Sequence, residues 1–177
     1  MKVWSKPRVG VSLCLRGELC RYDGGHTRHD LVEKILEPRC QLLPVCPERE
    51  IGLPVPREKL LLVGPPDYPT LVGEESLALH GDALRAFARQ WIATTHAEGL
   101  HGFVLQSRSP SCGVGSTWRR ERRESEPVRD GTGLFAEVLL ELHPDLPIRE
   151  DTALLDEAVC WKFLAAVEDY AGQQHSE

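Results

Sequence analysis

Short apolar runs alternate with longer amphipathic stretches along this chain. The runs at 8–13, 41–45 and 102–105 are continuous and rich in aliphatic residues, which predicts buried strands. A further short strand is expected at 60–63, and a short edge strand at 146–148. Continuous apolar runs of this length are typical of a parallel sheet that is covered on both faces.

Apolar residues recur at helical spacing in the stretches between these runs. The pattern predicts a helix from Thr27 that ends before Pro38, a strong helix over 82–98 with an aromatic stripe that packs in the core, and a helix over 134–142. A last amphipathic helix follows from Asp151. The alternation of strands and helices predicts an α/β protein with a doubly wound, mostly parallel sheet and helices on both faces.

Two stretches lack this periodicity. Residues 47–69 are dense in proline and glycine, which predicts a long irregular connection of the kind that often carries function. Residues 118–133 are charged and are expected to form a surface excursion. With 177 residues, the chain is predicted to form one α/β domain over 1–150, with a C-terminal helix over 151–177 packed on the same domain.

Charge and targeting signals narrow the class of protein. The chain carries 27 acidic and 21 basic residues, so its net charge gives no sign of nucleic-acid binding. The run from Trp118 to Arg123 offers an indole and four arginines, but a solvated charged loop is favoured because acidic residues interleave. The segment Met1–Arg8 lacks the apolar core of a signal peptide, and no apolar stretch is long enough to span a bilayer. We therefore expect a cytoplasmic protein without membrane contact, in which the six cysteines are reduced thiols.

Three of these cysteines each come just after a predicted strand. Cys14 follows 8–13, Cys46 follows 41–45, and Cys112 lies in the turn after 102–105. The carboxyl ends of parallel strands meet at one edge of a sheet, where open α/β sheets bind ligands. Three thiolates at this edge indicate a metal centre with a vacant position, and the alternative is independent burial of three small apolar side chains.

The remaining thiols and two histidines have simpler interpretations. Cys160 lies inside an amphipathic helix and is predicted to be a buried core residue, and Cys40 is also predicted to be structural. Cys20 lies near the Asp23 turn and is expected to approach the site without being a ligand. His26 and His29 are expected to be solvated residues at the start of a helix.

Four motifs in order carry a resemblance to a known family. They are Ser12–Gly17, Cys20–His26, Pro44–Glu48 and Ser107–Gly113, within a region of about 8–150. This chain resembles the thiouracil desulfurase family, a bacterial family with a Rossmann-like fold. Two further stretches, 133–136 and 146–150, are most similar to members fused to a second domain, which remove sulfur from 4-thiouridine in transfer RNA.

The resemblance implies a cofactor and a set of site residues. Members hold a 4Fe-4S cluster by three cysteines, which by motif position are Cys14, Cys46 and Cys112 here, and one iron stays free to take the substrate's sulfur. We expect Glu48 to act as general base or proton shuttle, with an exposed loop glutamate as the alternative. The expected substrate-binding residues are Ser12, Asp23, Gly24, Gly25, Ser107, Ser109, Ser111 and Gly113. The alternative for Ser107, Ser109 and Ser111 is a turn or a helix cap, and the alternative for 23–25 is a turn with positive backbone angles. One departure is Gln106, where the family commonly has lysine.

The predicted function follows from this resemblance. We expect an enzyme that hydrolyses C=S to C=O in a small thiolated pyrimidine, such as 2-thiouracil, 4-thiouracil or 4-thiouridine. One alternative is desulfuration of 4-thiouridine in tRNA, which would require a basic surface around the crevice. Another is a non-catalytic iron-sulfur or zinc-binding module, in which Cys20 or Glu48 would fill the vacant position.

Overall fold

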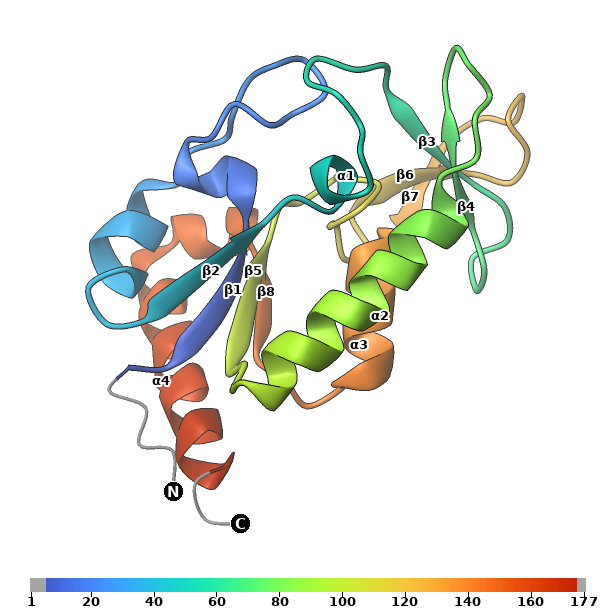
Figure 1. Ribbon diagram of the computed structural model, residues 1–177. Helices are drawn as coiled ribbons and strands as arrows, with labels where there is room; N and C mark the ends of the chain where they lie inside the picture. Colours follow the sequence, from blue (N-terminus) through green and yellow to red (C-terminus); the bar gives the residue numbers. More distant parts are fainter. Residues whose placement is uncertain (1–5, 175–177) are drawn as a thin grey trace.

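The core of the molecule is a parallel sheet of four strands (Figure 1). In the computed structural model, which describes residues 6–174, the strand order is β2-β1-β5-β8 and every neighbouring pair is parallel. The strands are β1 Arg8–Ser12, β2 Gln41–Val45, β5 Gly102–Leu105 and β8 Ile148–Glu150. The predicted α/β class is confirmed, and three of these strands lie where the continuous apolar runs placed them.

Helices cover both faces of this sheet (Figure 1). One face packs against α2 (Gly81–Ala97) and α3 (Leu134–Leu142), which share a buried cluster with Phe103 and Leu105 of β5. The other face packs against α4 (Glu157–Gln174) and a short π-helical segment, Val32–Leu36. The aromatic stripe of α2 does pack in the core, because Trp91 meets the rings of Phe103 and Phe135 edge to face, with centroids 5.9 and 5.7 Å away.

A glycine in the central strand makes room for this aromatic cluster. Gly10 of β1 lies under the Phe103 ring, and a Cβ added at Gly10 would sit 2.3 Å from the ring carbon Cε2. The neighbouring residues Val9 and Val11 point to the opposite face, where they pack in the cluster formed with α4. The alternation of side chains in a strand therefore assigns Gly10 to the face that the aromatic rings occupy.

A second sheet lies beside the first and was not predicted. Its strand order is β4-β3-β6-β7, built from β3 Leu60–Val63, β4 Thr70–Gly73, β6 Thr117–Arg120 and β7 Val128–Gly131. The prediction for 118–133 missed the antiparallel pair β6-β7 at the two ends of this stretch, whereas the residues between these strands are largely exposed, as expected of a surface excursion. The inward position Arg119 is buried and pairs with Asp130 at 2.8 Å, so the strand contains no apolar alternation for the sequence to reveal.

The first predicted helix begins later than expected, although it ends before Pro38 as predicted. The backbone N–H of Thr27 donates to the Cys14 carbonyl and that of His29 to the Leu15 carbonyl, both at 3.0 Å. This pairing holds the segment extended beside residues 14–15, so helical structure begins only at Asp30. The prediction of a solvated His29 was wrong, since its ring is buried and its Nε2 lies 2.9 Å from the Asp151 carbonyl oxygen. His26 is exposed.

The end of the chain packs on the first sheet. A 3-10 segment, Asp151–Leu155, follows β8 directly and leads into α4, whose Phe163 and Val167 contact the backbone position of Gly102 closely. No helix within residues 6–174 is long and apolar enough to cross a bilayer. The first five residues of the predicted 1–150 domain and of the Met1–Arg8 segment, and the last three of the predicted 151–177 helix, lie outside the described residues.

Candidate functional site

The carboxyl edge of the parallel sheet brings three sequence-distant cysteines to one place. β1 and β2 pair in register up to Ser12 and Val45, so the two strands end side by side at the carboxyl edge of the sheet. Cys14 lies in the 3-10 turn Leu13–Arg16, and Cys46 directly precedes the short helix α1, Pro47–Glu50. Cys112 comes from the loop after β5.

Local hydrogen bonds fix the loop that carries Cys112. The Ser109 hydroxyl oxygen accepts from the backbone N–H groups of Ser111 at 3.2 Å and Cys112 at 3.1 Å. The start of α3 also bonds to this loop, because the Phe135 N–H donates to the Ser111 carbonyl at 2.9 Å. A Cβ at Gly133 would lie 2.3 Å from the Ser111 carbonyl carbon, so α3 approaches this loop as closely as glycine permits.

The three cysteines line a single small cavity of about 40 Å³, together with Cys20. Its wall also contains the polar residues Ser12, Arg21, Glu48, Arg57, Gln106, Ser109 and Ser111. A larger cavity of about 360 Å³ lies next to it, and the two share wall residues that include Glu48, Arg57 and Gln106. The site therefore consists of an inner thiol cavity and an outer chamber with polar walls.

The four thiols have unequal proton affinities. A hydrogen bond from the Cys20 thiol lowers the pKa of Cys14, and lowers that of Cys46 to about 7, while the pKa of Cys20 itself is raised. Burial raises the pKa of Cys112. As a thiol, Cys14 donates to the Gln106 amide oxygen at 3.0 Å. The Cys20 thiol has one hydrogen, so it can stabilise the thiolate of either Cys14 or Cys46 at a given time.

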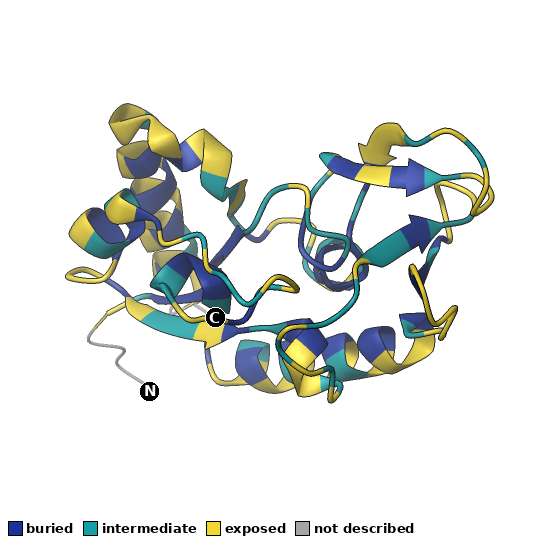
Figure 2. Cartoon of the chain, turned by 90° about the horizontal axis from the view of Figure 1, so that it is seen from above, coloured by how far each residue is buried: buried dark blue, intermediate teal, exposed yellow. Residues whose placement is uncertain are grey.

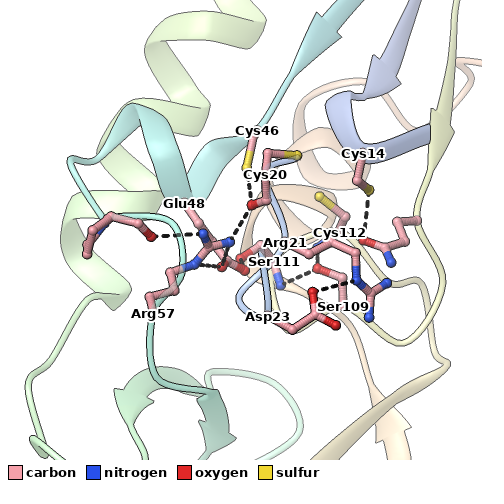
Figure 3. A network of polar contacts seen from close by, with 12 residues as sticks. Cys14, Cys20, Arg21, Asp23, Cys46, Glu48, Arg57, Ser109, Ser111 and Cys112 are labelled. Atoms are coloured by element: carbon pink, nitrogen blue, oxygen red, sulfur yellow. Dashed lines mark hydrogen bonds and ion pairs between the residues drawn. The ribbon is translucent and has the colours of Figure 1, made fainter. Parts of the chain in front are cut away.

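Glu48 is buried against the same cavity, which does not support the alternative of an exposed loop glutamate. Its Oε1 accepts from the Ser111 hydroxyl and its Oε2 from Arg57 Nε, each at 2.7 Å (Figure 3). Arg57 Nη2 also donates to the Cys20 carbonyl at 3.0 Å. One network of hydrogen bonds therefore links the Glu48 carboxylate to the loops that carry Cys20 and Cys112.

Sequence reasoning missed Arg57. It lies in the proline- and glycine-rich connection, where no periodicity or motif distinguishes it from its neighbours. Its role depends on three partners from different parts of the chain: Glu48, Cys20 and the Tyr22 carbonyl, which accepts from its backbone N–H at 2.8 Å. The only signal available was the general tendency of long connections to carry functional residues.

The serines predicted to bind substrate occupy different parts of the site. Ser12 and Ser111 line the inner cavity, Ser107 lines the outer chamber, and Ser109 lines both. The Ser12 hydroxyl oxygen accepts from the Gln106 N–H at 3.0 Å, which ties β1 to the end of β5. The Ser107 N–H donates to Asp151 Oδ1 at 2.7 Å, so Asp151 orients one wall of the chamber.

The predicted glycines and Asp23 lie outside both walls. Asp23 is exposed, and its Oδ1 accepts from the Gly25 N–H at 2.9 Å, which closes a local turn around Gly24. Gly113 packs tightly, since a Cβ there would lie 2.3 Å from Thr117 Oγ1. The hydrogen bond within 23–25 matches the turn alternative for Asp23, Gly24 and Gly25.

The other two cysteines line neither the inner cavity nor the outer chamber. Cys40 and Cys160 are buried in the cluster between the sheet, the π-helical segment and α4. Burial raises the pKa of both thiols, to about 11 for Cys40, as expected for structural cysteines in apolar surroundings.

The fold and the site together define an α/β protein with a thiol-lined cavity at the carboxyl edge of a parallel sheet. The model of the 2-thiouracil desulfurase family matches residues 9–151, and the chain therefore belongs to that family. The chain is similar to the solved structure of a 4Fe-4S-dependent thiouracil desulfidase, TudS, with 27% identity, a TM-score of 0.67 and coverage of 89% of this chain and 99% of that one. It is also 29% identical over 110 residues to the uncharacterized protein YbbK of Bacillus subtilis (strain 168), covering 59% of this chain and 72% of that protein.

Proposed function

We propose that this protein hydrolyses the C=S group of a thiolated pyrimidine to C=O, with release of hydrogen sulfide. The reaction consumes one water and changes no oxidation state, because the oxygen of water replaces the sulfur and the sulfur leaves as hydrogen sulfide. The observation that carries the proposal is the convergence of three cysteines and a buried carboxylate on one cavity next to a larger chamber. Family membership and the similar thiouracil desulfidase support it.

The inner cavity fits an iron-sulfur cluster held by Cys14, Cys46 and Cys112. Thiolates are the ligands that such clusters use, and the Cys20 thiol can stabilise the thiolate form of Cys14 or Cys46. When bound, a 4Fe-4S cluster with three protein ligands supplies an open Lewis-acidic iron that has affinity for soft sulfur. Cys20 then stays a protonated neighbour that can donate a hydrogen bond.

Glu48 is suited to remove a proton from the attacking water. It is buried at the boundary of cavity and chamber, and it has the carboxylate chemistry of a general base. Arg57 and the Ser111 hydroxyl each hold one of its oxygens, so the carboxylate has a fixed direction. Arg57 contacts Oε2 through both Nε and Nη2, whereas Oε1 accepts from Ser111 and keeps a second acceptor site for water or substrate.

The outer chamber is the proposed binding site for the pyrimidine. Its volume of about 360 Å³ lies within the range of small-molecule sites and accommodates a base or a nucleoside. Gln106 lines both hollows and offers an amide, which can pair with the N–H and C=O edge of the ring. The Ser107 and Ser109 side chains supply further donors in the same wall.

The alternative of a zinc-binding module has less support. Residues 6–174 contain no group of three or more His, Cys, Asp or Glu side chains that could hold one metal ion. Ligands of a tetrahedral zinc share a single ion, whereas cluster ligands bind separate irons and can lie farther apart. Glu48 is also engaged already by Arg57 and Ser111.

Desulfuration by the reconstituted protein tests the proposal. Protein loaded anaerobically with iron and sulfide is incubated with 2-thiouracil or 4-thiouridine, and both the released sulfide and the loss of thiocarbonyl absorbance are followed. We expect turnover that falls about 10²- to 10⁴-fold in Glu48→Gln, which keeps the shape of the side chain but removes the base. Loaded protein that turns over neither compound contradicts the proposal, as does full activity in Glu48→Gln.

A further inference from the structure

A buried hydroxyl beside the thiol cavity has no partner. The segment 26–29 runs along the turn after β1 and alternates between solvent and interior, so that His26 and Arg28 are exposed and His29 is buried (Figure 2). The Oγ1 atom of Thr27 is shielded from solvent and forms no hydrogen bond with any of residues 6–174. Buried polar groups are nearly always paired, because an unpaired one loses its bonds to water and gains none. The Thr27 hydroxyl therefore indicates a partner that the chain alone does not supply.

Cys14 is the neighbour that this hydroxyl faces. The Thr27 backbone N–H donates to the Cys14 carbonyl at 3.0 Å, which holds the two residues side by side. The pKa of Cys14 is lowered most strongly by the Cys20 thiol and also by the Thr27 hydroxyl, so both groups lie near its sulfur. As a neutral thiol, Cys14 gives its hydrogen to the Gln106 amide oxygen at 3.0 Å. The Thr27 hydroxyl can complete its own hydrogen bond when Cys14 is a thiolate, the form that binds metal.

The surrounding contacts keep the hydroxyl in this position. Thr27 lines the outer chamber and Cys14 lines the inner cavity, so the hydroxyl lies where the two hollows meet. Two residues further on, the His29 N–H donates to the Leu15 carbonyl at 3.0 Å, and its ring lies 2.9 Å from the Asp151 carbonyl oxygen. The backbone is thus bonded on both sides of Arg28, and a β-branched side chain such as threonine has few rotamers.

We propose that Thr27 is a positioning residue of the cluster site, whose hydroxyl donates a hydrogen bond to the Cys14 sulfur when that sulfur binds iron. The inference rests on the proposed function, because it needs a cluster on Cys14. A hydrogen bond to a ligating sulfur withdraws negative charge from it, which favours the reduced, more electron-rich state of a cluster. The same withdrawal makes the iron a stronger Lewis acid toward a substrate's sulfur. Thr27 therefore acts on the reaction through Cys14.

Unfolding of the metal-free protein tests whether the hydroxyl is unpaired. Valine has the shape of threonine without the hydroxyl, so Thr27→Val should leave the urea midpoint unchanged or raise it. The matched control is Thr117→Val, which removes a buried hydroxyl that donates to the Ser109 carbonyl at 2.8 Å and should lower the midpoint. A drop in Thr27→Val as large as that in Thr117→Val would show that the Thr27 hydroxyl already forms a structural bond, and would overturn the inference.

The reduction potential of the loaded protein tests the bond to Cys14. In a dye-mediated titration followed by electron paramagnetic resonance, Thr27→Val should lower the ratio of reduced to oxidised cluster at a given potential by about 3- to 10-fold. A tenfold change corresponds to a fall of about 59 mV for one electron. Thr27→Ser keeps the hydroxyl and should restore the wild-type potential, and the control Thr152→Val, at an exposed residue of the outer chamber, should not shift it. An unchanged potential in Thr27→Val, or an equal shift in Thr27→Ser, would overturn the inference.

These measurements separate the inference from the proposed function. A shifted potential in Thr27→Val, together with wild-type protein that desulfurates no thiolated pyrimidine, contradicts only the proposed function. Turnover by the wild type, together with an unchanged potential in Thr27→Val, contradicts only the inference. Wild-type protein that assembles no cluster contradicts both.

Discussion

Removal of the Arg57 guanidinium should destabilise the protein far more than removal of an exposed arginine. In Arg57→Met the Glu48 carboxylate loses its Nε donor at 2.7 Å and its second contact at 2.6 Å from Nη2. The Cys20 carbonyl loses its donor at 3.0 Å. Among residues 6–174, Glu48 would then be a buried charge with the Ser111 hydroxyl as its remaining partner.

The burial of the Arg57–Glu48 ion pair determines how much free energy of unfolding is lost. The side chains of Arg57 and Glu48 are 5% and 11% exposed, and removal of one partner of a buried ion pair costs about 3–5 kcal/mol. The pair Arg89–Glu141 is 49% and 56% exposed, so Arg89→Met should cost at most about 1 kcal/mol. Both substitutions replace arginine by methionine in an ion pair, which makes Arg89→Met a matched control.

Urea unfolding of the metal-free variants, followed by circular dichroism, measures these free energies. The double variant Arg57→Met with Glu48→Leu should be less destabilised than the sum of the single variants, because neither partner is left as an unpaired buried charge. If Arg57→Met does not fold, the recovery of a folded double variant still tests the coupling. Equal destabilisation by Arg57→Met and Arg89→Met, or strict additivity in the double variant, would refute the buried network.

Three further results are expected. Serine in place of any one of the three proposed ligand cysteines should abolish the visible cluster absorbance after anaerobic reconstitution, whereas Cys160→Ala should keep it; retention in any of the three serine variants would remove that cysteine from the set. Gly10→Ala should lower the free energy of unfolding by about 1–3 kcal/mol in urea titrations, because its Cβ overlaps the Phe103 ring, and an unchanged midpoint would contradict this packing. His96 and His143 stack with ring centroids 3.7 Å apart, and burial lowers the pKa of both below the ordinary 6.5. The unfolded chain therefore binds more protons, so stability should fall as the pH drops below about 6.5, and His143→Gln should flatten this slope in unfolding curves recorded from pH 7 to 5.

The sequence predicted best those features that depend on continuous apolar runs. The strands at 41–45 and 102–105 are found with the predicted bounds because each carries a run of apolar residues, but only β5 is buried throughout, whereas β2 lies at the edge of the sheet and only its Val45 is buried. The convergence of Cys14, Cys46 and Cys112 followed from the same reasoning, because it needs only the strand ends and a parallel arrangement. A few short apolar runs were thus enough to predict the position of the site.

Features that depend on polar pairing could not be predicted in this way. β6 places Arg119 at an inward position, where apolar alternation would normally mark a strand, and its charge is balanced by Asp130 from the next strand. The backbone N–H groups of Thr27 and His29 bond to carbonyls of the turn after β1, so this segment does not form helical hydrogen bonds. Arg57 matters because of its contacts with Glu48 and Cys20, which the fold brings close to it. Neither its residue type nor its position in the sequence predicts these contacts.

The most direct measurement of the central claim is the iron and acid-labile sulfide content of anaerobically reconstituted protein, compared between wild type and the serine variants of the three cysteines. The account predicts about four irons and four sulfides per wild-type chain, and loss of both in each variant. One zinc and no labile sulfide in the wild type, or a full cluster in a variant that lacks Cys14, Cys46 or Cys112, would contradict it.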